Sequence, residues 1–243
     1  MSRASIVLVH GWGFDSSVWA TLQTHLKKFN TITIDLPGYG EQKNNKTEWK
    51  LDQLTDDLIA RTPKNAIWLG WSLGGLLTLY IAAQKPTHIK ALLTIASTPS
   101  FTQKPGWNCA MDIDIFNAFK QSCENDKDKC LQDFRGLVSF GAEKKTIIKT
   151  RAQTCTADIA TLLAGLALLE QTDLRLTLKK IKCPRKYLFA SKDSLVPTNA
   201  CTQINHYSDS NEIVLINDAS HALPLSHPKI ITQHTQALIH ATH

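Results

Sequence analysis

A five-residue turn, Gly70-Trp71-Ser72-Leu73-Gly74, dictates how the first half of this chain must fold. It separates a short apolar run at 66–69 from a longer, helix-forming apolar run at 75–83. A G-x-S-x-G sequence between a strand and a helix is typical of a nucleophile elbow. The turn is so tight that the residues two before and two after the serine must lack side chains. The pattern predicts a serine projecting from the end of a buried strand. A glycine-rich loop without chemistry is the alternative interpretation.

Short apolar runs rich in β-branched residues alternate with helix-like stretches over residues 5–97, and such runs return near the C-terminus. Runs of this kind, bounded by turn residues, indicate buried parallel strands joined by helical crossovers. We therefore predict an α/β fold, a mostly parallel sheet with helices on both faces. The expected strands lie within Ile6–Val9, Thr31–Ile34, Ile67–Leu69, Ala91–Ile95, Tyr187–Ala190 and Glu212–Ile216.

The stretch between about residues 100 and 170 has a different character. It is helical in period and contains few convincing strands. We interpret it as a helical cap inserted into the α/β core. The predicted division is a core formed by residues 1–99 and 171–243, with the cap at 100–170.

A serine nucleophile needs a base, and the base needs an acid that orients it. His221 lies on a loop just after the predicted strand at 212–216. Open parallel sheets gather their functional residues at the carboxyl ends of strands, so we assign the base to His221. The other histidines after Ser72 lie in connections or near the terminal helix, at His88, His206, His227, His234, His240 and His243.

The orienting acid is predicted to be Asp193, which follows the expected strand at 187–190. A buried carboxylate there would hold the imidazole tautomer and stabilise its protonated form. Asp218 is the alternative, since it lies only three residues from His221, but such proximity more often produces a local turn bond. Asp173 is expected to cap a helix or turn.

Two backbone N–H groups are predicted to form an oxyanion hole. One belongs to Leu73, which follows the serine, and the other to Trp12, in the glycine-rich loop after the first strand. The glycines on both sides of Trp12 permit backbone shapes that aim its N–H into the site. His10, which opens this loop, is interpreted as a structural residue that fixes the turn, with a second catalytic base as the alternative.

Composition argues against several other classes of function. No window reaches the roughly 18 uncharged apolar residues of a membrane helix. The formal net charge of +6 comes without a Lys/Arg cluster interleaved with aromatic residues, so we expect no nucleic-acid partner. The six cysteines lack C-x-x-C spacing, which predicts free thiols and no metal site. Because no signal-peptide pattern opens the chain, we expect a cytoplasmic protein.

Taken together, these motifs resemble the α/β-hydrolase superfamily with a helical cap, in which Ser, Asp and His follow in that order along the chain. More narrowly, the chain is similar to the BioH family of pimeloyl-[acyl-carrier protein] methyl ester esterases. The residues that carry the resemblance are His10-Gly11-Trp12-Gly13, Asp35-Leu36-Pro37-Gly38-Tyr39-Gly40, the elbow with its flanks at 66–76, the segments 96–101 and 172–175, Asp193 and His221.

The resemblance implies a serine carboxylesterase of biotin synthesis that removes the methyl group from a pimeloyl chain on acyl carrier protein, through an acyl-enzyme on Ser72. It implies an apolar channel between core and cap, with Trp12, Trp71 and Phe134 contacting the substrate. The reaction that the resemblance implies requires no cofactor, and we expect the protein to be a monomer.

The resemblance also implies that basic cap residues meet the acidic carrier protein. The candidates are Arg135, Lys144, Lys145, Lys149 and Arg151, which face Glu143 alone within 135–151. A solvated helix face is the alternative interpretation, because residues 98–170 hold nine basic and nine acidic residues.

Two other functions stay open at this point. A generalist short-chain esterase or thioesterase would use the same triad, and the cap rather than the motifs separates it from the carrier-specific enzyme. A non-catalytic binding protein is the third possibility. The presence of Ser72, Asp193 and His221 together argues against it, since a binding role would permit the loss of any of them.

Overall fold

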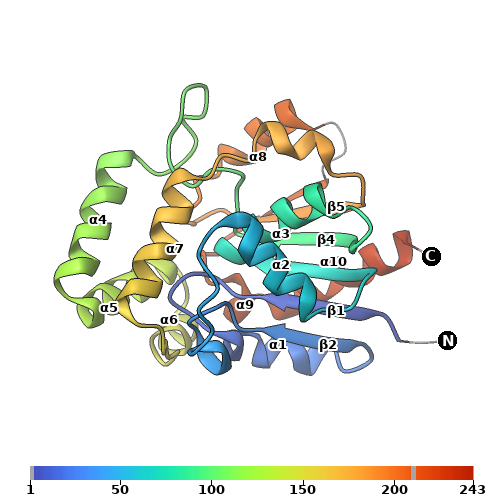
Figure 1. Cartoon of the computed structure of the whole chain (residues 1–243), viewed down its shortest axis with the longest axis horizontal. Coiled ribbons are helices and arrows are strands. Elements are labelled where there is room, and N and C mark those ends of the chain that lie inside the picture. The colour runs from blue at the N-terminus through green and yellow to red at the C-terminus, as the bar shows by residue number, and fades with distance from the viewer. Residues whose placement is uncertain (1–2, 209–211, 243) are drawn as a thin grey trace.

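A computed structural model describes residues 3–208 and 212–242 of the chain. In the described residues, six strands form one sheet in the order β2-β1-β3-β4-β5-β6, and every neighbouring pair is parallel. The first strand, β1, lies beside the edge strand β2, and the sheet continues on its other side from β3 to β6 (Figure 1). The strands are β1 (Ser5–Val9), β2 (Asn30–Ile34), β3 (Ala66–Trp71), β4 (Ile89–Ile95), β5 (Arg185–Ala190) and β6 (Glu212–Ile216).

Each of the six predicted strands falls within one of these observed strands, so the predicted α/β fold is confirmed. The strands β3 and β5 are buried along their whole length, and β1 and β4 are buried except for one residue each. Burial on both faces explains why their sequences read as continuous apolar runs rather than as an alternation of apolar and polar residues.

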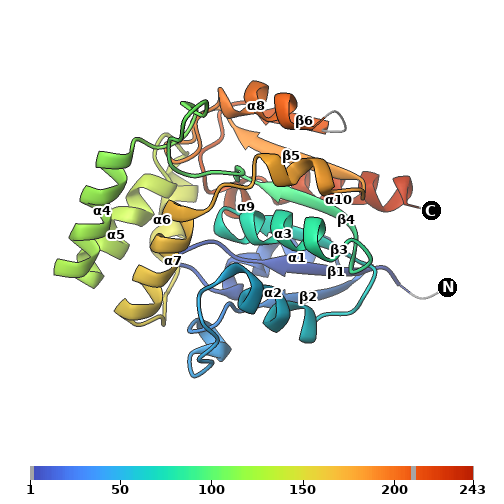
Figure 2. The same ribbon diagram turned by 45° about the horizontal axis from the view of Figure 1, so that its top comes forward.

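Helices cover both faces of the sheet (Figures 1 and 2). The helices α2 (Leu51–Ala60) and α3 (Leu73–Gln84) pack together on one face, and α1 (Ala20–His25) packs with α10 (Pro228–Ala241) on the other. Shorter helical segments lie in the connections: η1 (Ser16–Trp19), η2 (Gly40–Gln42), η3 (Leu176–Lys180), α8 (Ala200–Gln203), η4 (Ile204–Tyr207) and α9 (Leu223–Ser226).

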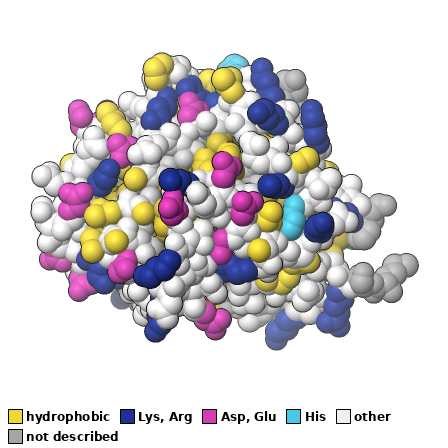
Figure 3. Space-filling view, in the orientation of Figure 1, with side chains coloured by type: hydrophobic (Ala, Val, Ile, Leu, Met, Phe, Trp, Pro, Cys, Tyr) yellow, Lys and Arg dark blue, Asp and Glu magenta, His cyan; other side chains and the backbone are white. Residues whose placement is uncertain are grey.

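Four helices lie between β4 and β5, beyond the carboxyl ends of the strands (left in Figure 1). They are α4 (Ile113–Asn125), α5 (Lys127–Val138), α6 (Lys144–Arg151) and α7 (Ile159–Gln171). Asp112, Asp126 and Asp158 begin three of them, each accepting a hydrogen bond from a first-turn N–H. We propose that residues 100–170 are the cap. Apolar side chains lie at the surface of this part of the molecule (left in Figure 3).

No helix in the described residues is long and apolar enough to cross a membrane.

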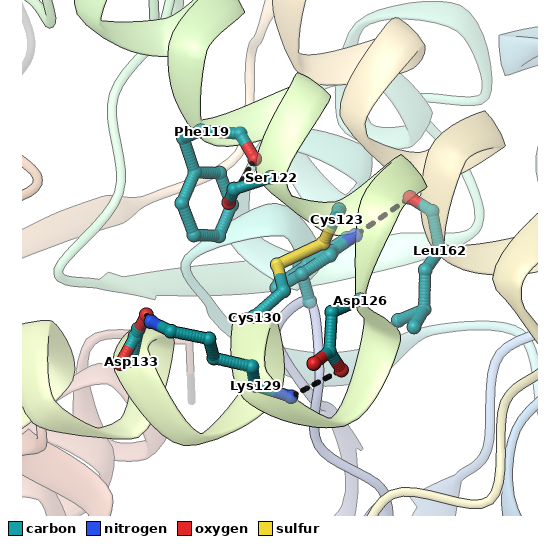
Figure 4. The surroundings of a disulfide bond; sticks show 9 residues. Phe119, Ser122, Cys123, Asp126, Lys129, Cys130, Asp133 and Leu162 are labelled. Carbon is teal, nitrogen blue, oxygen red and sulfur yellow. Dashed lines mark hydrogen bonds and ion pairs between the residues drawn. A yellow bond between two sulfur atoms is a disulfide. The ribbon is translucent and has the colours of Figure 1, made fainter.

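A disulfide between Cys123 and Cys130 joins the end of α4 to the start of α5 (Figure 4). The prediction of six free thiols is therefore wrong for this pair. The reversal of the chain at Asp126, where α4 ends and α5 begins, brings the two cysteines together, and linear spacing does not reveal such a reversal. The four other cysteines are unpaired in the described chain: Cys109, Cys155, Cys183 and Cys201.

Candidate active site

Ser72 occupies the junction between β3 and α3, as the G-x-S-x-G pattern predicts. Its backbone has φ 54° and ψ −119°, a combination that residues with a side chain rarely adopt. Neighbouring groups hold the turn in place, because Ser72 N–H donates to the Ile95 carbonyl at 3.0 Å and Ser97 Oγ donates to the Ser72 carbonyl at 2.7 Å. The serine is thus lifted out of the sheet on strained backbone.

The glycines of the elbow are required by contacts with backbone atoms. A Cβ on Gly70 would overlap the Gly74 carbonyl, and a Cβ on Gly74 would overlap the Val9 carbonyl of the neighbouring strand. Gly75 has the same role against a side chain, since its Cβ would lie 2.5 Å from Ser97 Cβ. These contacts give the physical reason for the spacing of small residues around Ser72.

His221 and Asp193 form a buried pair at the carboxyl ends of β6 and β5. His221 Nδ1 lies 2.8 Å from Asp193 Oδ2 and 3.0 Å from Asp193 Oδ1, and both side chains are almost completely buried. Asp193 Oδ1 also accepts hydrogen bonds from the N–H groups of Leu195 and Val196, at 2.8 and 2.9 Å. These two bonds fix the carboxylate, which in turn fixes the orientation of the imidazole.

The other ring nitrogen of His221 is free to accept a proton. Because a carboxylate only accepts hydrogen bonds, the contact with Asp193 assigns the proton to Nδ1 and leaves a lone pair on Nε2. Nε2 is buried and makes no hydrogen bond with any residue of the described chain. The loop that carries His221 is tied to the elbow, since Trp71 Nε1 donates to the His221 carbonyl at 2.9 Å.

Other candidates for the acid and the base have different partners. Asp218 is exposed and forms an ion pair with Lys192 at 2.8 Å. Asp173 accepts the Arg175 N–H within a turn, at 3.1 Å. His10 is fully buried and uses both ring nitrogens, Nδ1 on the Gly11 carbonyl at 2.8 Å and Nε2 on a backbone N–H at 3.0 Å. Burial lowers the pKa of His10. It is a neutral structural residue, as expected.

The backbone N–H groups of Trp12 and Leu73 are among those near Ser72 that lack an acceptor within the described residues. Leu73 opens α3, where first-turn N–H groups have no partner in the helix. The loop that carries Trp12 runs beside the serine, because a Cβ on Gly11 would lie 3.1 Å from Ser72 Cβ. The oxyanion-hole role predicted for these two N–H groups is therefore kept as a proposal.

A cavity of about 250 Å³ opens at Ser72 between the core and the cap. Of the predicted substrate contacts, Trp12 and Phe134 line it, with ring centroids 4.7 Å apart. Most of the remaining wall is apolar and comes from the cap, and sequence reasoning did not identify it. The available signal was the apolar positions at helical spacing on α4. The remaining residues that line the cavity are Phe101, Met111, Ile115, Phe116, Phe119, Leu137, Leu166, Leu169 and Leu195, with Asp112 and Ser194 as polar members.

Trp71, predicted as a third substrate contact, does not line this cavity. Its ring is fully buried against Phe14, with centroids 4.8 Å apart, and against His221 at 5.6 Å. Successive strand residues point to opposite faces, so neighbours in sequence need not share a surface. Trp71 supports the histidine loop instead of contacting the cavity.

The five basic residues of the expected docking cluster do not share one recess. Arg135 and Arg151 line a recess of about 560 Å³, and Arg151 also lines a second one whose wall includes Leu137, at the rim of the serine cavity. Lys145 and Lys149 line a separate recess against α9 and α10, and Lys144 lines none of the three. None of the five forms an ion pair within the described chain.

The site combines an elbow serine with a buried His–Asp pair on the loops after β5 and β6 and with two unpaired N–H groups. This combination is typical of a hydrolase of the α/β class. Residues 6–233 match the alpha/beta hydrolase family, and the chain belongs to it. It is similar to solved structures of a hydrolase from Oleispira antarctica (TM-score 0.88, 19% identity, 100% of this chain and 92% of that one) and an esterase from Exiguobacterium antarcticum (TM-score 0.86, 20% identity, 97% and 91%). At such identities the likeness shows the fold alone.

Curated relatives narrow the class. The chain is 34% identical over 243 residues to a pimeloyl-[acyl-carrier protein] methyl ester esterase from Xylella fastidiosa (strain M23), covering 97% of this chain and 94% of that protein. It is 31% identical over 236 residues to the esterase of the same name from Edwardsiella ictaluri (strain 93-146), covering 93% and 90%. This protein is accordingly a carboxylic ester hydrolase.

Proposed function

We propose that the protein is a serine esterase that hydrolyses the methyl ester of pimeloyl-[acyl-carrier protein], a step of biotin synthesis, through an acyl-enzyme on Ser72. The observation that carries the chemistry is the buried Asp193–His221 pair. His221 Nε2 has no hydrogen-bond partner in the described residues, and the His221 loop is tied to Trp71, the last residue of the strand before Ser72. The ester is inferred from the names of the relatives.

In the first half of the reaction, Ser72 Oγ attacks the ester carbonyl carbon while its proton passes to His221 Nε2. The Trp12 and Leu73 N–H groups donate hydrogen bonds to the carbonyl oxygen as it becomes an oxyanion. Asp193 stabilises the imidazolium without taking its proton. His221 then protonates the methoxide oxygen, methanol leaves, and the acyl group stays on Ser72.

In the second half, water replaces the alcohol. His221 Nε2 takes a proton from the water as its oxygen attacks the acyl carbonyl, and the same two N–H groups stabilise the second oxyanion. His221 returns the proton to Ser72 Oγ when the acyl bond breaks. The net change is one ester and one water converted to one carboxylic acid and one methanol.

The apolar cavity suits a substrate chain of methylene groups. Phe116, Phe119 and Leu166 present hydrocarbon along its wall, and each buried methylene contributes roughly 0.8 kcal/mol. The pimeloyl chain offers such a run of methylenes between its two carbonyl groups. A generalist esterase could use the same surface for other acyl chains, so the carrier must supply part of the specificity.

The Arg135–Arg151 recess is the proposed contact for the acidic carrier protein. Arg151 also lines the second recess, which adjoins the rim of the serine cavity through Leu137, a residue that is 40% exposed. Unpaired arginines suit carboxylates or a phosphodiester because the guanidinium group can donate two parallel hydrogen bonds. Lys145 and Lys149 lie in the recess against α10 and are left out of the proposed contact.

The nucleophile is tested by Ser72→Ala. The variant should lose at least about 10³-fold in kcat on p-nitrophenyl acetate, while its far-ultraviolet circular dichroism stays that of the wild type. Substantial residual turnover by the folded variant would contradict the assignment of Ser72.

The substrate is tested by incubating the wild type with methyl-pimeloyl carrier protein and measuring the loss of the methyl group by mass spectrometry. We expect kcat/KM on this substrate to exceed that on free methyl esters. A protein that ignores the carrier-bound ester and hydrolyses p-nitrophenyl acetate is the generalist esterase instead.

The docking surface is tested by charge reversal. Arg151→Glu should lower kcat/KM on the carrier-bound ester about tenfold and leave p-nitrophenyl acetate unaffected, with an effect that shrinks as salt increases. Lys145→Glu, in the recess against α10, and Lys27→Glu, an exposed site in the turn after α1, are matched controls. Equal losses in all three variants would contradict a contact at Arg151.

A further inference from the structure

The side chain of Trp12, a core residue, is held by the cap. Its indole Nε1–H donates to the Leu162 carbonyl on α7 at 2.8 Å, across 150 positions of sequence, and the residue is 1% exposed. A main-chain carbonyl inside a helix cannot move without moving the helix. The hydrogen bond therefore ties the loop after β1 to α7 as a unit.

A notch in α7 admits the indole ring. Gly165 lies three residues after Leu162, and a Cβ there would be 2.8 Å from Trp12 Cδ1 and 3.3 Å from Trp12 Nε1. Glycine inside a helix is unfavourable relative to alanine, so the packing of Trp12 gives this position a reason for its glycine. Any larger residue would push the ring away from the Leu162 carbonyl.

Two further cap helices close around the same ring. The ring of Phe134 on α5 meets it in a T-shaped contact, at a centroid distance of 4.7 Å and an interplanar angle of 88°, and Phe119 on α4 meets it at 5.6 Å and 70°. Leu162 itself lies beside the Cys123–Cys130 disulfide that joins these two helices (Figure 4). The indole is thus fixed by α4, α5 and α7 together.

We propose that α7 positions the oxyanion hole, because the Leu162 carbonyl and the Gly165 notch fix the ring of the residue whose backbone N–H is the proposed donor. Leu162 and Gly165 are positioning residues and do not contact the reacting atoms. The cap would then serve the chemical step as well as the choice of acyl chain. The inference rests on the proposed serine chemistry but not on which ester is the substrate.

The test compares two glycine-to-alanine changes in the cap. Gly165→Ala forces a Cβ against Trp12, whereas Gly136→Ala on α5 meets no atom within 4 Å. With p-nitrophenyl acetate, Gly165→Ala should lower kcat by about 10- to 100-fold with KM changed less than about threefold, since a small misplacement of a donor weakens only the transition state. Gly136→Ala should keep the wild-type kcat.

A second readout separates positioning from a general loss of stability. Phenylboronic acid adds to a catalytic serine as a tetrahedral adduct with an oxygen in the oxyanion hole, so its Ki should rise in parallel with the loss of kcat. Trp12→Phe, which keeps a ring but lacks the donor to Leu162, should show the same parallel changes. It also covers the case in which Gly165→Ala does not fold.

A folded Gly165→Ala or Trp12→Phe whose kcat and boronate Ki stay within twofold of the wild type would overturn the inference. So would a rise in KM alone, which would assign the ring to substrate binding only. Failure on carrier-bound ester, with these effects intact on p-nitrophenyl acetate, would count against the proposed substrate and leave the role of α7 standing.

Discussion

His221 Nδ1 and Asp193 Oδ2 lie 2.8 Å apart, although 28 positions of sequence separate the two residues. The orientation of the carboxylate is fixed, because its other oxygen, Oδ1, accepts hydrogen bonds from the N–H groups of Leu195 and Val196 in the same loop. Position and tautomer of the imidazole are therefore set before any substrate arrives. This anchored pair supplies the oriented base that the proposed nucleophile, Ser72, requires.

Asp193→Asn should lower kcat on p-nitrophenyl acetate by about 10³- to 10⁴-fold while the fold is kept. An amide of the same size can donate a hydrogen bond to Nδ1, which favours the wrong tautomer. The matched control is Asp218→Asn, an exposed acid near His221 that pairs with Lys192 and should change kcat less than about twofold. Similar losses in the two variants would contradict the assignment of Asp193.

Gly74→Ala should destabilise the protein by about 3 kcal/mol, because its Cβ would overlap the Val9 carbonyl, and neither backbone segment can move freely. The free energy of unfolding in urea measures the effect. Gly136→Ala provides the comparison, since open space surrounds that position and alanine is the better helix former. A Gly74→Ala variant as stable as the wild type would mean that the elbow has room that these contacts exclude.

Much of the core could be predicted because its signals are local. The apolar runs of β3 and β4 are long enough to read as buried strands, and the G-x-S-x-G turn joins β3 to its helix by a constraint that involves only neighbouring residues. His221 and Asp193 followed from one rule of parallel sheets, that residues just beyond the strands meet at one edge.

The cavity and the packing of the cap helices could not be predicted from the sequence, because they depend on how helices meet. Phe119 and Leu166 come from different helices, and nothing in either segment says that they face the same space. Trp71, a predicted substrate contact, does not line the cavity, because a position next to Ser72 does not decide which way a strand residue points. The pairing of Cys123 with Cys130 required the α4–α5 turn to be known first.

Removing the disulfide should loosen the cap more than the core. A Cys130→Ser variant should lose about 2 kcal/mol of unfolding free energy, the size expected for a short closed loop. Dithiothreitol should lower the free energy of unfolding of the wild type toward that of the variant, and it should leave the value for the variant unchanged. If the wild type carries two free thiols there by mass spectrometry after alkylation without reductant, the bond does not form in solution.

The buried imidazole of His10 should make stability depend on pH. Burial lowers the pKa of His10 below its ordinary value of 6.5, although the Asp35 and Asp15 carboxylates oppose the shift. Below about pH 6.5 the unfolded chain binds a proton that the folded protein does not, so the free energy of unfolding must fall as pH falls, by at most about 1.4 kcal/mol per unit. Above that pH both states are neutral, and the full stability is present.

Unfolding in urea at pH 7.5, 6.5 and 5.5 measures how the free energy of unfolding depends on pH. His10→Asn should unfold more easily at pH 7.5 but show a shallower slope. Burial also lowers the pKa values of His88 and His227. These two residues contribute to the slope in both proteins, so the difference between the slopes isolates the effect of His10. Identical slopes in the wild type and His10→Asn would show that His10 is not the neutral residue its two hydrogen bonds require.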